Sequence, residues 1–398
     1  MLQHKKIILG ICGGIAAYKC AHLVRLLVKQ GAEVRVVMTA SAAQFITPQT
    51  LSVLSKNTVV QDFFDDTLNW NNHVQLAEWA DVMVIAPLTA NTLAKMASGE
   101  ADNLLLATFL SSRQQVFVAP AMDLEMYRHA TVAENLAKLQ ALGHLVIPAE
   151  SGELASGLVG EGRMAEPENI VSFIEKTLKQ GLPFSGKKVL ITAGPTHEAI
   201  DPVRFIGNRS SGKMGLALAE AFLAQGADVI LVMGPVDIQN YPPGIHLIKV
   251  ESADDMHAAV MAHYAAQDIV VCSAAVADYK AASVSTSKLK KSEDSFQLSL
   301  VKNRDILAGL GQEKKHQFLV GFALETEDLL ANAAKKLAGK NLDLIVANAA
   351  NEPGVGMGHD TNAVTVLDRH NNAYKFELKS KQRIAHDIVG VIEKNMHG

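Results

Sequence analysis

The feature that most constrains the fold is an alternation of short apolar runs with longer amphipathic segments. The first half of the chain reads KKIILGI, AAYKCAHLVRLLVKQ, EVRVVMT, ADVMVIAP, TANTLAKMASG and QVFVAPA. Short β-rich runs separated by helical patterns of about 10 to 15 residues are typical of βαβ units that form a parallel sheet. This half is therefore predicted to be a layered α/β domain.

The second half restarts the same order of elements. Its segments are KKVLITAG, SGKMGLALAEAFLAQ, ADVILVMGP, IHLIKV, a helix over 252–266, DIVVCSAAVADY, FLVGFALET, a helix over 327–340, DLIVANA and AVTVLD. LLVKQGAEVRVVMT and AFLAQGADVILVMG read as a pseudo-repeat. Gly181, Pro183 and Gly186 end the intervening helix. We expect two Rossmann-like parallel-sheet domains, 1–180 and 181–398, as the 398-residue length suggests.

Composition narrows the functional class. Apolar residues make up 48% of the chain and the net charge is −4, without a basic face, a basic tail or a long uncharged apolar segment. These features favour neither nucleic acid nor a membrane surface as partner. The three cysteines, Cys12, Cys20 and Cys272, are odd in number and lie in apolar surroundings, which favours a reducing cytoplasmic compartment.

Two glycine-rich segments are candidate phosphate sites. GICGGIAAYK, 10–19, places glycines between a strand and a helix, which suits either a tight turn or a bound phosphate. It lacks the GxGxxG spacing and the later acidic residue of a dinucleotide site, so flavin mononucleotide (FMN) fits better. GNRSSGKMG, 207–215, has Met214 where a P-loop has Ser or Thr, but Ser210, Ser211 and Gly212 could still begin a phosphate-binding helix.

Three further segments each allow a structural and a functional interpretation. KLKK, 288–291, is either a solvated charged loop or a contact to a polyanion. His73 is either structural or a proton-transfer group. ESGELASGLVGEGRM, 150–164, is either a linker or a lid, and a predicted helix that follows it near Pro167 places it inside the first domain.

Ordered motifs along the whole chain resemble the bacterial bifunctional phosphopantothenoylcysteine decarboxylase and phosphopantothenate–cysteine ligase family of coenzyme A synthesis. In the first half they are GGIAAYK, NHVQLAEWAD, APLTANT, PAMDLEMY and GEGRM. In the second half they are ITAGPTHEAIDPVRFIGNRSSGKMG, AAVADYK, KLKK, VKNRDIL and KNLDLIVAN. The resemblance implies an N-terminal flavoprotein domain and a C-terminal CTP-dependent ligase domain.

For the ligase, the resemblance implies that CTP activates 4′-phosphopantothenate as an acyl-cytidylate with release of diphosphate, and that L-cysteine then forms the amide. Lys288 matches the lysine needed for activation, and Asn208 matches the asparagine that binds the acyl-cytidylate. Mg²⁺ is expected with CTP, although its ligands are not identified. The implied CTP positions are Cys272, Ser273, Ala274, Asp278, Lys288, Arg304, Asp305, Ile306, Leu307, Phe322, Lys336 and Lys340.

For the first half, the resemblance implies FMN-dependent decarboxylation of 4′-phosphopantothenoyl-L-cysteine to 4′-phosphopantetheine and CO₂. The cysteine moiety is oxidised to a thioaldehyde, CO₂ leaves, and the enethiol is reduced again. His73 matches the active-site histidine. The implied FMN positions are Gly13, Gly14, Ile15, Thr39, Pro87, Thr89, Asn91 and Thr92. The family also implies a homo-oligomer, a dodecamer built from flavin-domain trimers and ligase-domain dimers.

Two implied catalytic positions depart from the family pattern. Asp123 stands where an asparagine usually meets the substrate carboxylate, and two carboxylates about 4 Å apart repel by roughly 4 kcal/mol at an effective dielectric constant near 20. Asp123 must therefore be protonated or paired with a cation to replace asparagine. Ser156 replaces the cysteine thought to protonate the enethiol, and a hydroxyl is a far weaker acid than a thiol.

Three accounts of these departures remain open. The decarboxylase is impaired, or other groups such as Glu153, Glu161 or water compensate, or the two residues were exchanged together in a working variant. We favour the working variant because His73, PLTANT and GEGRM are intact. The alternatives for the first half are an inactive flavoprotein domain beside a ligase and a flavin-binding regulatory or scaffold domain.

Overall fold

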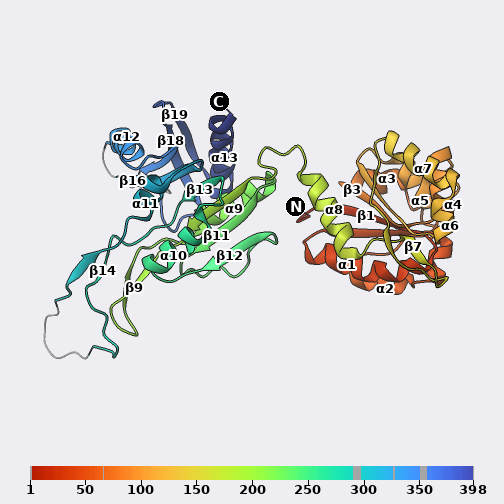
Figure 1. The fold of residues 1–398 in the computed structure, drawn as a ribbon, viewed down its shortest axis with the longest axis horizontal. Coiled ribbons are helices and arrows are strands. Elements are labelled where there is room, and N and C mark those ends of the chain that lie inside the picture. Colours follow the sequence, from red (N-terminus) through yellow and green to blue (C-terminus); the bar gives the residue numbers. More distant parts are fainter. Residues whose placement is uncertain (1, 66, 290–296, 326–327, 350–355, 398) are drawn as a thin grey trace. The chain divides into compact units, whose positions relative to one another are not determined.

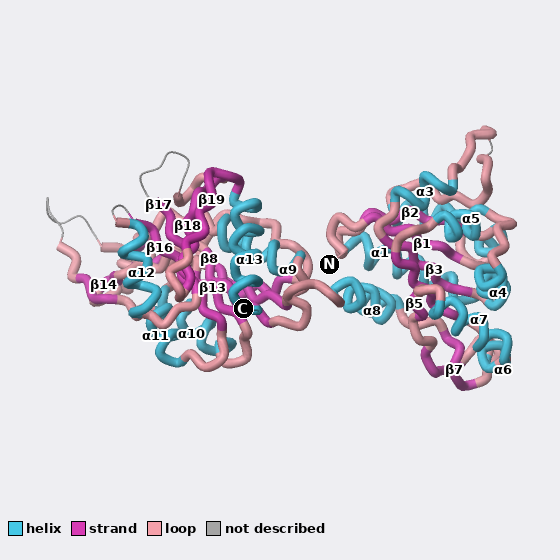
Figure 2. Tube along the Cα trace, turned by 90° about the horizontal axis from the view of Figure 1, so that it is seen from above, coloured by secondary structure: helices cyan, strands magenta, loops and turns pink. Residues whose placement is uncertain are grey.

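The computed structural model describes residues 2–65, 67–289, 297–325, 328–349 and 356–397. The chain forms two compact units, Met1–Leu178 (unit 1) and Lys179–Gly398 (unit 2). In both, helices cover the two faces of a central sheet (Figures 1 and 2). The predicted α/β fold class is confirmed.

Unit 1 contains a parallel sheet in the order β2-β1-β3-β4-β5. Because helices cover both faces, its strands are continuous apolar runs, and all seven residues of β3 are buried. The strands are β1 (Lys6–Ile11), β2 (Glu33–Met38), β3 (Val82–Leu88), β4 (Gln115–Pro120) and β5 (Leu145–Val146).

Two groups of helices enclose this sheet. One core joins α1, α2 and α8 to one face, and a second joins α4, α5 and α7 to the other. Side chains that accept backbone N–H groups at the N-caps fix the start of α2, α3, α4 and α5. The helical segments are η1 (Ile15–Lys19), α1 (Cys20–Lys29), η2 (Ala40–Gln44), α2 (Pro48–Ser55), α3 (His73–Trp79), α4 (Ala90–Ser98), α5 (Leu104–Ser111), α6 (Leu124–Arg128), α7 (Ala130–Ala141) and α8 (Pro167–Lys179).

The segment 150–164 is a β-hairpin rather than an irregular loop. Its antiparallel strands are β6 (Glu150–Glu153) and β7 (Val159–Arg163), and the turn lies between them. The hairpin belongs to unit 1. Its glycines hide the alternation that would have predicted strands, since glycine has no side chain to mark a face.

Unit 2 contains a larger mixed sheet in the order β12-β11-β8-β13-β16-β17-β18-β19. The first six strands in this order, from β12 at the edge to β17, are parallel. β18 and β19 add an antiparallel edge, and the sequence predicted only β18 of these two. The strands are β8 (Lys188–Ala193), β11 (Asp228–Met233), β12 (Ile245–Lys249), β13 (Ile269–Cys272), β16 (Phe318–Glu325), β17 (Leu344–Ala349), β18 (Thr361–Asp368) and β19 (Ala373–Ser380).

Helices also cover both faces of the unit 2 sheet. α9 (Lys213–Ala224) and α13 (Lys381–His397) pack on one face. α10 (Ala253–Tyr264), α11 (Ile306–Glu313) and α12 (Leu329–Gly339) pack on the other, and α10 and α12 confirm the helices predicted over 252–266 and 327–340, apart from residue 327, which is not described. Among the residues described, none of the helices combines the length and the apolar composition that a membrane span requires.

Two small hairpins extend from unit 2. They are β9 (His197–Ala199) with β10 (Phe205–Gly207), and β14 (Tyr279–Ala281) with β15 (Leu300–Lys302). Figure 1 shows β9 and β14 at the same end of the sheet. The amide of Ser285 donates to the carbonyl of Ile200 over 3.0 Å, which joins the two extensions.

Strand order locates one candidate site in each unit. In unit 1, successive strands are added to one side of β1 and then, from β3 on, to its other side. In unit 2, the same reversal of strand order lies between β8 and β13. Ligands of open α/β sheets bind beyond the carboxyl ends of the strands at such a switch point. The loops after these four strands are therefore the segments to examine.

Candidate functional site

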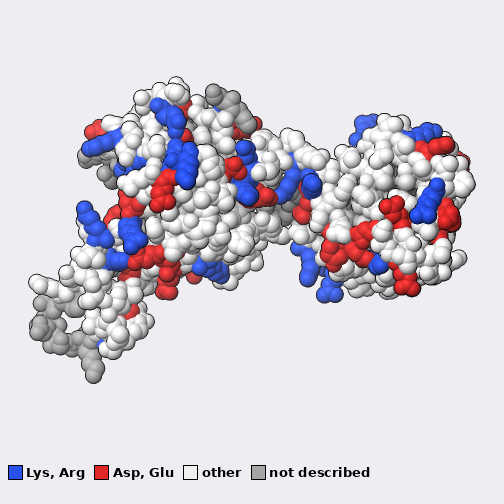
Figure 3. Space-filling view, viewed as in Figure 1, with Lys and Arg blue, Asp and Glu red and all other residues white. Residues whose placement is uncertain are grey.

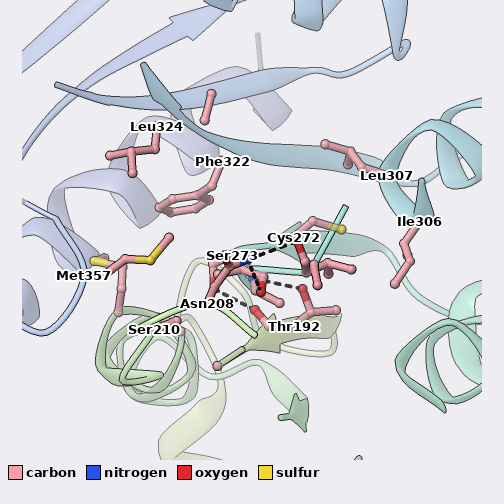
Figure 4. Close-up of a pocket in the computed structure, with 18 of the residues that line it drawn as sticks. Thr192, Asn208, Ser210, Cys272, Ser273, Ile306, Leu307, Phe322, Leu324 and Met357 are labelled. Carbon is pink, nitrogen blue, oxygen red and sulfur yellow. Dashed lines mark hydrogen bonds between the residues drawn. The ribbon is translucent and has the colours of Figure 1, made fainter. Parts of the chain in front are cut away.

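Unit 2 has a cavity of about 830 Å³ at its switch point. The loops after β8 and β13, strand β16 itself and the start of α9 contribute to its wall (Figure 4). Every position predicted to contact CTP lines the cavity except Lys288, and Asn208 lines it as well. The lining positions from that set are Cys272, Ser273, Ala274, Asp278, Arg304, Asp305, Ile306, Leu307, Phe322, Lys336 and Lys340.

Hydrogen bonds fix the loops around this cavity. The Ser273 hydroxyl donates to the carbonyl of Thr192 over 2.6 Å, which joins the ends of β13 and β8. The Asn208 side-chain amide donates to the carbonyls of Ala275 and Val276 over 3.0 and 3.2 Å. Figure 4 shows Phe322 projecting from the opposite wall toward this loop. The amide oxygen of Asn208 makes no hydrogen bond with a described residue and can accept one from a ligand.

The helix α9 approaches the sheet closely at Gly215. A Cβ atom at this residue would lie 2.3 Å from the Cβ of Ala193 and 2.8 Å from the hydroxyl of Ser273. Glycine therefore lets the first turn of α9, with Ser210, Ser211 and Gly212 before it, lie against the cavity. No helix follows β8 directly, as a P-loop would require, because the hairpin β9–β10 intervenes.

Cationic side chains line the cavity at two places. Lys340 contacts Asp305 at 2.7 Å; burial alone would raise the pKa of Asp305, but Lys340 and Lys336 lower it. On the other side, Lys381 is only 5% exposed. Burial lowers the pKa of Lys381, the nearby Lys213 charge lowers it further, and Asp360 opposes the shift. The wall is thus suited to a ligand with several negative charges.

Cys272 contributes to the wall as a neutral thiol. Burial raises its pKa to about 12, and the hydrogen bond with Thr192 offsets only part of this effect. Because the thiolate is the reactive form of cysteine, this residue is not a nucleophile at neutral pH.

Lys288 lies on the extension of unit 2 rather than in the cavity wall. Its side chain is exposed. The N–H and the carbonyl of the next residue, Leu289, are both hydrogen-bonded. The carboxylate of Asp201 accepts the Leu289 N–H over 3.1 Å, and the Arg204 guanidinium donates to the Leu289 carbonyl over 3.0 Å. Lys290 and Lys291, the rest of the predicted lysine motif, lie outside the described residues.

Asp201 was not predicted as a functional residue, although it lies in a quoted motif. Two hydrogen bonds from the Arg204 guanidinium, both to one carboxylate oxygen, hold the pKa of Asp201 well below its usual range. Its contact with Leu289 joins positions 88 residues apart. Sequence spacing gave no signal of that contact.

In unit 1, the predicted FMN positions gather at the other switch point. Gly13, Gly14 and Ile15 follow β1, Thr39 follows β2, and Pro87 is near the end of β3. Thr89 caps α4, which contains the exposed Asn91 and the buried Thr92. The amide of Cys12 donates to the Pro87 carbonyl over 3.3 Å and joins two of these loops.

The backbone at Gly13 and Gly14 has two different environments. A Cβ at Gly13 would lie 2.4 Å from the Ser41 hydroxyl, so this glycine allows a close approach of two loops. A Cβ at Gly14 would meet only Thr89, at 3.6 Å, so the backbone there borders open space. Such a turn before a helical segment fits a phosphate group.

His73 is the first residue of α3 and is partly buried. Asn72 caps this helix, and the rings of Phe63 and Trp70 lie edge-on to the imidazole at centroid distances of 6.0 and 6.3 Å. Its Nδ1 atom is buried without a hydrogen-bond partner among the described residues. Buried polar atoms are normally paired, so this nitrogen is a candidate contact for a ligand.

The two residues that flank Asp123 contact the hairpin 150–164. The amide of Met122 donates to the Gly162 carbonyl over 2.9 Å, and a Cβ at Gly160 would lie 2.5 Å from Leu124. Asp123 is the N-cap of α6 and accepts the Leu124 N–H over 2.7 Å. Asparagine and aspartate are both favoured N-caps, so this role tolerates either residue. Ser156 is exposed in the hairpin turn.

Metal binding and surface charge give no further site. Among residues placed by the structure, no group of three or more His, Cys, Asp or Glu side chains is arranged to hold a metal ion. Figure 3 shows acidic and basic side chains interspersed over the visible face.

Comparisons with known proteins agree on the family. Residues 1–179 match the model described as Flavoprotein, and residues 184–396 match the DNA/pantothenate metabolism flavoprotein C-terminal domain. Among solved structures, the C-terminal domain of a coenzyme A biosynthesis bifunctional protein CoaBC is 40% identical and covers 55% of this chain and 99% of that one, with a TM-score of 0.47.

Several relatives match most or nearly all of the sequence. A cysteine/cysteine sulfinic acid decarboxylase from an unknown prokaryotic organism is 50% identical over 88% of this chain and 100% of that protein. The coenzyme A biosynthesis bifunctional protein CoaBC of Bacillus subtilis (strain 168) is 46% identical over 98% of this chain and 97% of that protein. The chain belongs to the family of coenzyme A biosynthesis bifunctional proteins, in which a flavoprotein domain precedes a DNA/pantothenate metabolism flavoprotein C-terminal domain.

Proposed function

We propose that the chain catalyses two consecutive steps of coenzyme A synthesis. Residues 181–398 join 4′-phosphopantothenate to L-cysteine with CTP, and residues 1–180 decarboxylate the product with FMN. The observation that carries the ligase proposal is the 830 Å³ cavity, whose wall contains Asn208 and the predicted nucleotide positions other than Lys288. This volume is within the usual range of ligand sites, about 300–1,000 Å³.

In the ligase domain, charge determines the proposed roles. Lys336 and Lys340 bind the nucleotide, and Lys288, on the extension held at Leu289, closes over the triphosphate with its Mg²⁺ as the acyl-cytidylate forms. Asn208 contacts this intermediate through its amide oxygen. Cysteine then attacks the activated carbonyl, and CMP leaves.

In the flavoprotein domain, FMN is held at the switch point of the sheet. Gly13, Gly14 and Ile15 bind its phosphate through backbone N–H groups, and Thr39 and the PLTANT segment contact the rest of the molecule. When bound, FMN supplies a two-electron acceptor that is reoxidised within the same turnover. The open backbone at Gly14 supports this placement.

The chain's own residues would then position substrate and protons. His73 contacts the cysteine moiety through its Nδ1 atom, which has no hydrogen-bond partner among the described residues. Asp123 lies at the N-terminus of α6, where its carboxylate accepts a backbone N–H and approaches the substrate carboxylate only when protonated or paired with a cation. Ser156 lies in the hairpin that covers the substrate, with water or a neighbouring glutamate assisting the final protonation.

A smaller substrate is a second candidate for the flavoprotein domain. A relative 50% identical over 88% of this chain has the name cysteine/cysteine sulfinic acid decarboxylase. The two departures, Asp123 and Ser156, are both in the part of unit 1 proposed to contact the substrate. Free cysteine carries an amino group, and this cation could pair with the carboxylate of Asp123, whereas the amide of phosphopantothenoylcysteine cannot.

Three substrates supplied separately distinguish these candidates. Purified FMN-loaded protein receives equal concentrations of phosphopantothenoylcysteine, cysteine or cysteine sulfinic acid, and released CO₂ is measured. We expect kcat/KM to be at least about tenfold higher for phosphopantothenoylcysteine. A higher value for either free amino acid would assign the smaller substrate. If Asp123 pairs with the amino group of a free amino acid, Asp123→Asn should lower activity on that substrate. If it does not, the substitution should leave this activity unchanged.

The ligase step is tested by omission of one substrate at a time. CTP and phosphopantothenate without cysteine should release about one diphosphate for each active site. Added cysteine should then allow turnover and release CMP. Lys288→Gln should abolish the first release. Lys280→Gln, a substitution in β14 on the same extension but outside the cavity lining, is the matched control and should retain most activity. CMP formation that does not depend on cysteine would contradict the proposed order.

The assembly is proposed as a homo-oligomer with trimeric flavoprotein domains and dimeric ligase domains. Ile15 and Tyr18, next to the proposed FMN phosphate site, are 60% and 58% exposed. Large apolar side chains at such exposure favour contact with another surface. A native mass equal to twelve chains would support the dodecamer, and a monomer at micromolar concentration would contradict it.

A further inference from the structure

A buried lysine connects the glycine turn to the hairpin 150–164. Lys19 is the last residue of η1, which begins directly after Gly14. Its side chain is 6% exposed, and its ammonium group donates to the Met164 carbonyl and to Glu166, both over 2.9 Å. A buried ammonium group is unfavourable unless hydrogen-bond partners compensate it. Lys19 therefore needs Met164 and Glu166, at this end of the hairpin, to stay in place.

The residues around Lys19 form the base of the hairpin. Glu150 and Arg163 are opposite each other in the register of β6 and β7. Arg163 donates to the Glu166 carboxylate over 2.7 Å, and Glu150 accepts the Glu166 N–H over 3.1 Å. Glu150 also accepts from Asn169 over 2.6 Å. Lys19 thus binds a network that includes both strands of the hairpin and the start of α8.

Other contacts of the hairpin are mostly with the segment around α6. Between the base and the turn, Gly162 accepts the Met122 N–H and Gly160 packs on Leu124, and Leu154 is buried beside the turn. Ser156, Leu158 and Val159 in and beside the turn are exposed. A change in direction at the base would therefore shift β7 against the segment around α6 and displace the exposed turn.

We propose that Lys19 is a positioning residue of the decarboxylase, which fixes the hairpin base relative to the glycine turn and so places the hairpin over the substrate. This proposal rests on the proposed flavoprotein function. Lys19 acts through Met164 and Glu166 and does not touch the reacting atoms. The glycine turn does not itself depend on Lys19, because Gly14 accepts the Ala17 N–H and Gly13 packs on Ser41.

Lys19→Met tests this role because methionine has similar length but no charge or donor. Glu166 then retains Arg163 as its partner. The matched control is His22→Ala, which removes the exposed 2.7 Å contact between His22 of α1 and Glu168 of α8 without a change at the hairpin base. Ligase activity in the same chain reports that each variant is intact in unit 2.

We expect Lys19→Met to raise KM for phosphopantothenoylcysteine by about tenfold or more, because a misplaced contact of about 1 Å can have such an effect. FMN affinity should change less than about threefold, since the glycine turn keeps its own contacts. His22→Ala should leave both values near those of the natural chain. Equal KM values for the two variants would overturn the proposal, and so would parallel losses of FMN and substrate affinity, which indicate a general structural role.

Proteolysis gives a readout that does not require decarboxylase activity. A glutamate-specific protease under native conditions should cleave Lys19→Met at Glu153 or Glu161 at least about fivefold faster than His22→Ala. If no natural-chain activity is found on phosphopantothenoylcysteine but this difference persists, the proposed substrate fails and the positioning role stands. Equal cleavage rates overturn the positioning role. If Lys19→Met does not fold, Glu166→Gln is compared instead, with the same expected direction and a smaller effect.

Discussion

A methyl group at residue 13 should destabilise unit 1, whereas one at residue 14 should not. An ideal Cβ at Gly13 would lie 2.4 Å from Oγ, 2.6 Å from Cβ and 2.8 Å from the carbonyl carbon of Ser41. Rotation of the serine side chain relieves only the first contact, because the other atoms move with the backbone. At Gly14 the nearest atom is the Thr89 Cγ2, at 3.6 Å, which is an ordinary contact distance.

The magnitude follows from the cost of overpacking. Such insertions destabilise proteins by about 1–3 kcal/mol, and each kcal/mol shifts Tm by about 2–4 °C for a domain of this size. We therefore expect Gly13→Ala to lower the Tm of unit 1 by roughly 4–8 °C, for about 2 kcal/mol. Gly14→Ala should change the free energy of unfolding by less than about 0.5 kcal/mol.

Tryptophan fluorescence isolates this unit in the full chain. The two tryptophans of the chain, Trp70 and Trp79, both lie in unit 1. Thermal unfolding of FMN-free protein, followed at tryptophan emission, gives the Tm of each variant, and FMN titration gives its affinity. Gly14→Ala should weaken FMN binding without a stability loss, because its methyl group enters the open space beside the turn. Equal Tm values for Gly13→Ala and Gly14→Ala would refute the steric argument.

Three further changes test other parts of the account. Asp201→Asn should reduce ligase activity about tenfold through a looser lysine loop. Arg204 lowers the folded-state pKa of Asp201, so the stabilising effect of this carboxylate is complete above the unfolded pKa near 3.9 and is lost as pH falls through the folded pKa. The Tm difference between Asp201→Asn and the natural chain should therefore shrink below about pH 4. A Tm difference that stays constant with pH would contradict this. Lys340→Met should raise KM for CTP at least about tenfold, measured by CMP release, because it removes a charged contact and leaves Asp305 without its 2.7 Å partner; an unchanged KM would place CTP elsewhere. Ser156→Cys should increase decarboxylation if a missing thiol limits the rate, and no increase in CO₂ release would show that another group supplies the proton.

The sequence predicted the elements whose patterns are local. Apolar strand runs, helix caps and glycines after β1 are contained in short segments, so the α/β class and helices such as α8 and α10 could be identified. The edge strand β19 was missed because it is mostly polar and half-exposed. The hairpin 150–164 was missed because four glycines interrupt its alternation.

Long-range pairing could not be predicted. Asp201 binds Leu289, 88 residues away, and Lys19 binds Glu166, 147 residues away. In sequence these charged residues read as surface positions, because only the fold brings their partners close and buries them. The same limit applies to Asn208, whose place in the cavity was implied by family resemblance and not by its sequence neighbours.

The central claim is that one chain performs both steps in order. Purified protein with FMN receives 4′-phosphopantothenate, ¹³C-carboxyl-labelled cysteine, CTP and Mg²⁺, and products are quantified by mass spectrometry. The account predicts equal amounts of CMP, labelled CO₂ and 4′-phosphopantetheine. Phosphopantothenoylcysteine that accumulates without labelled CO₂, or labelled CO₂ that is released when CTP is omitted, would contradict it.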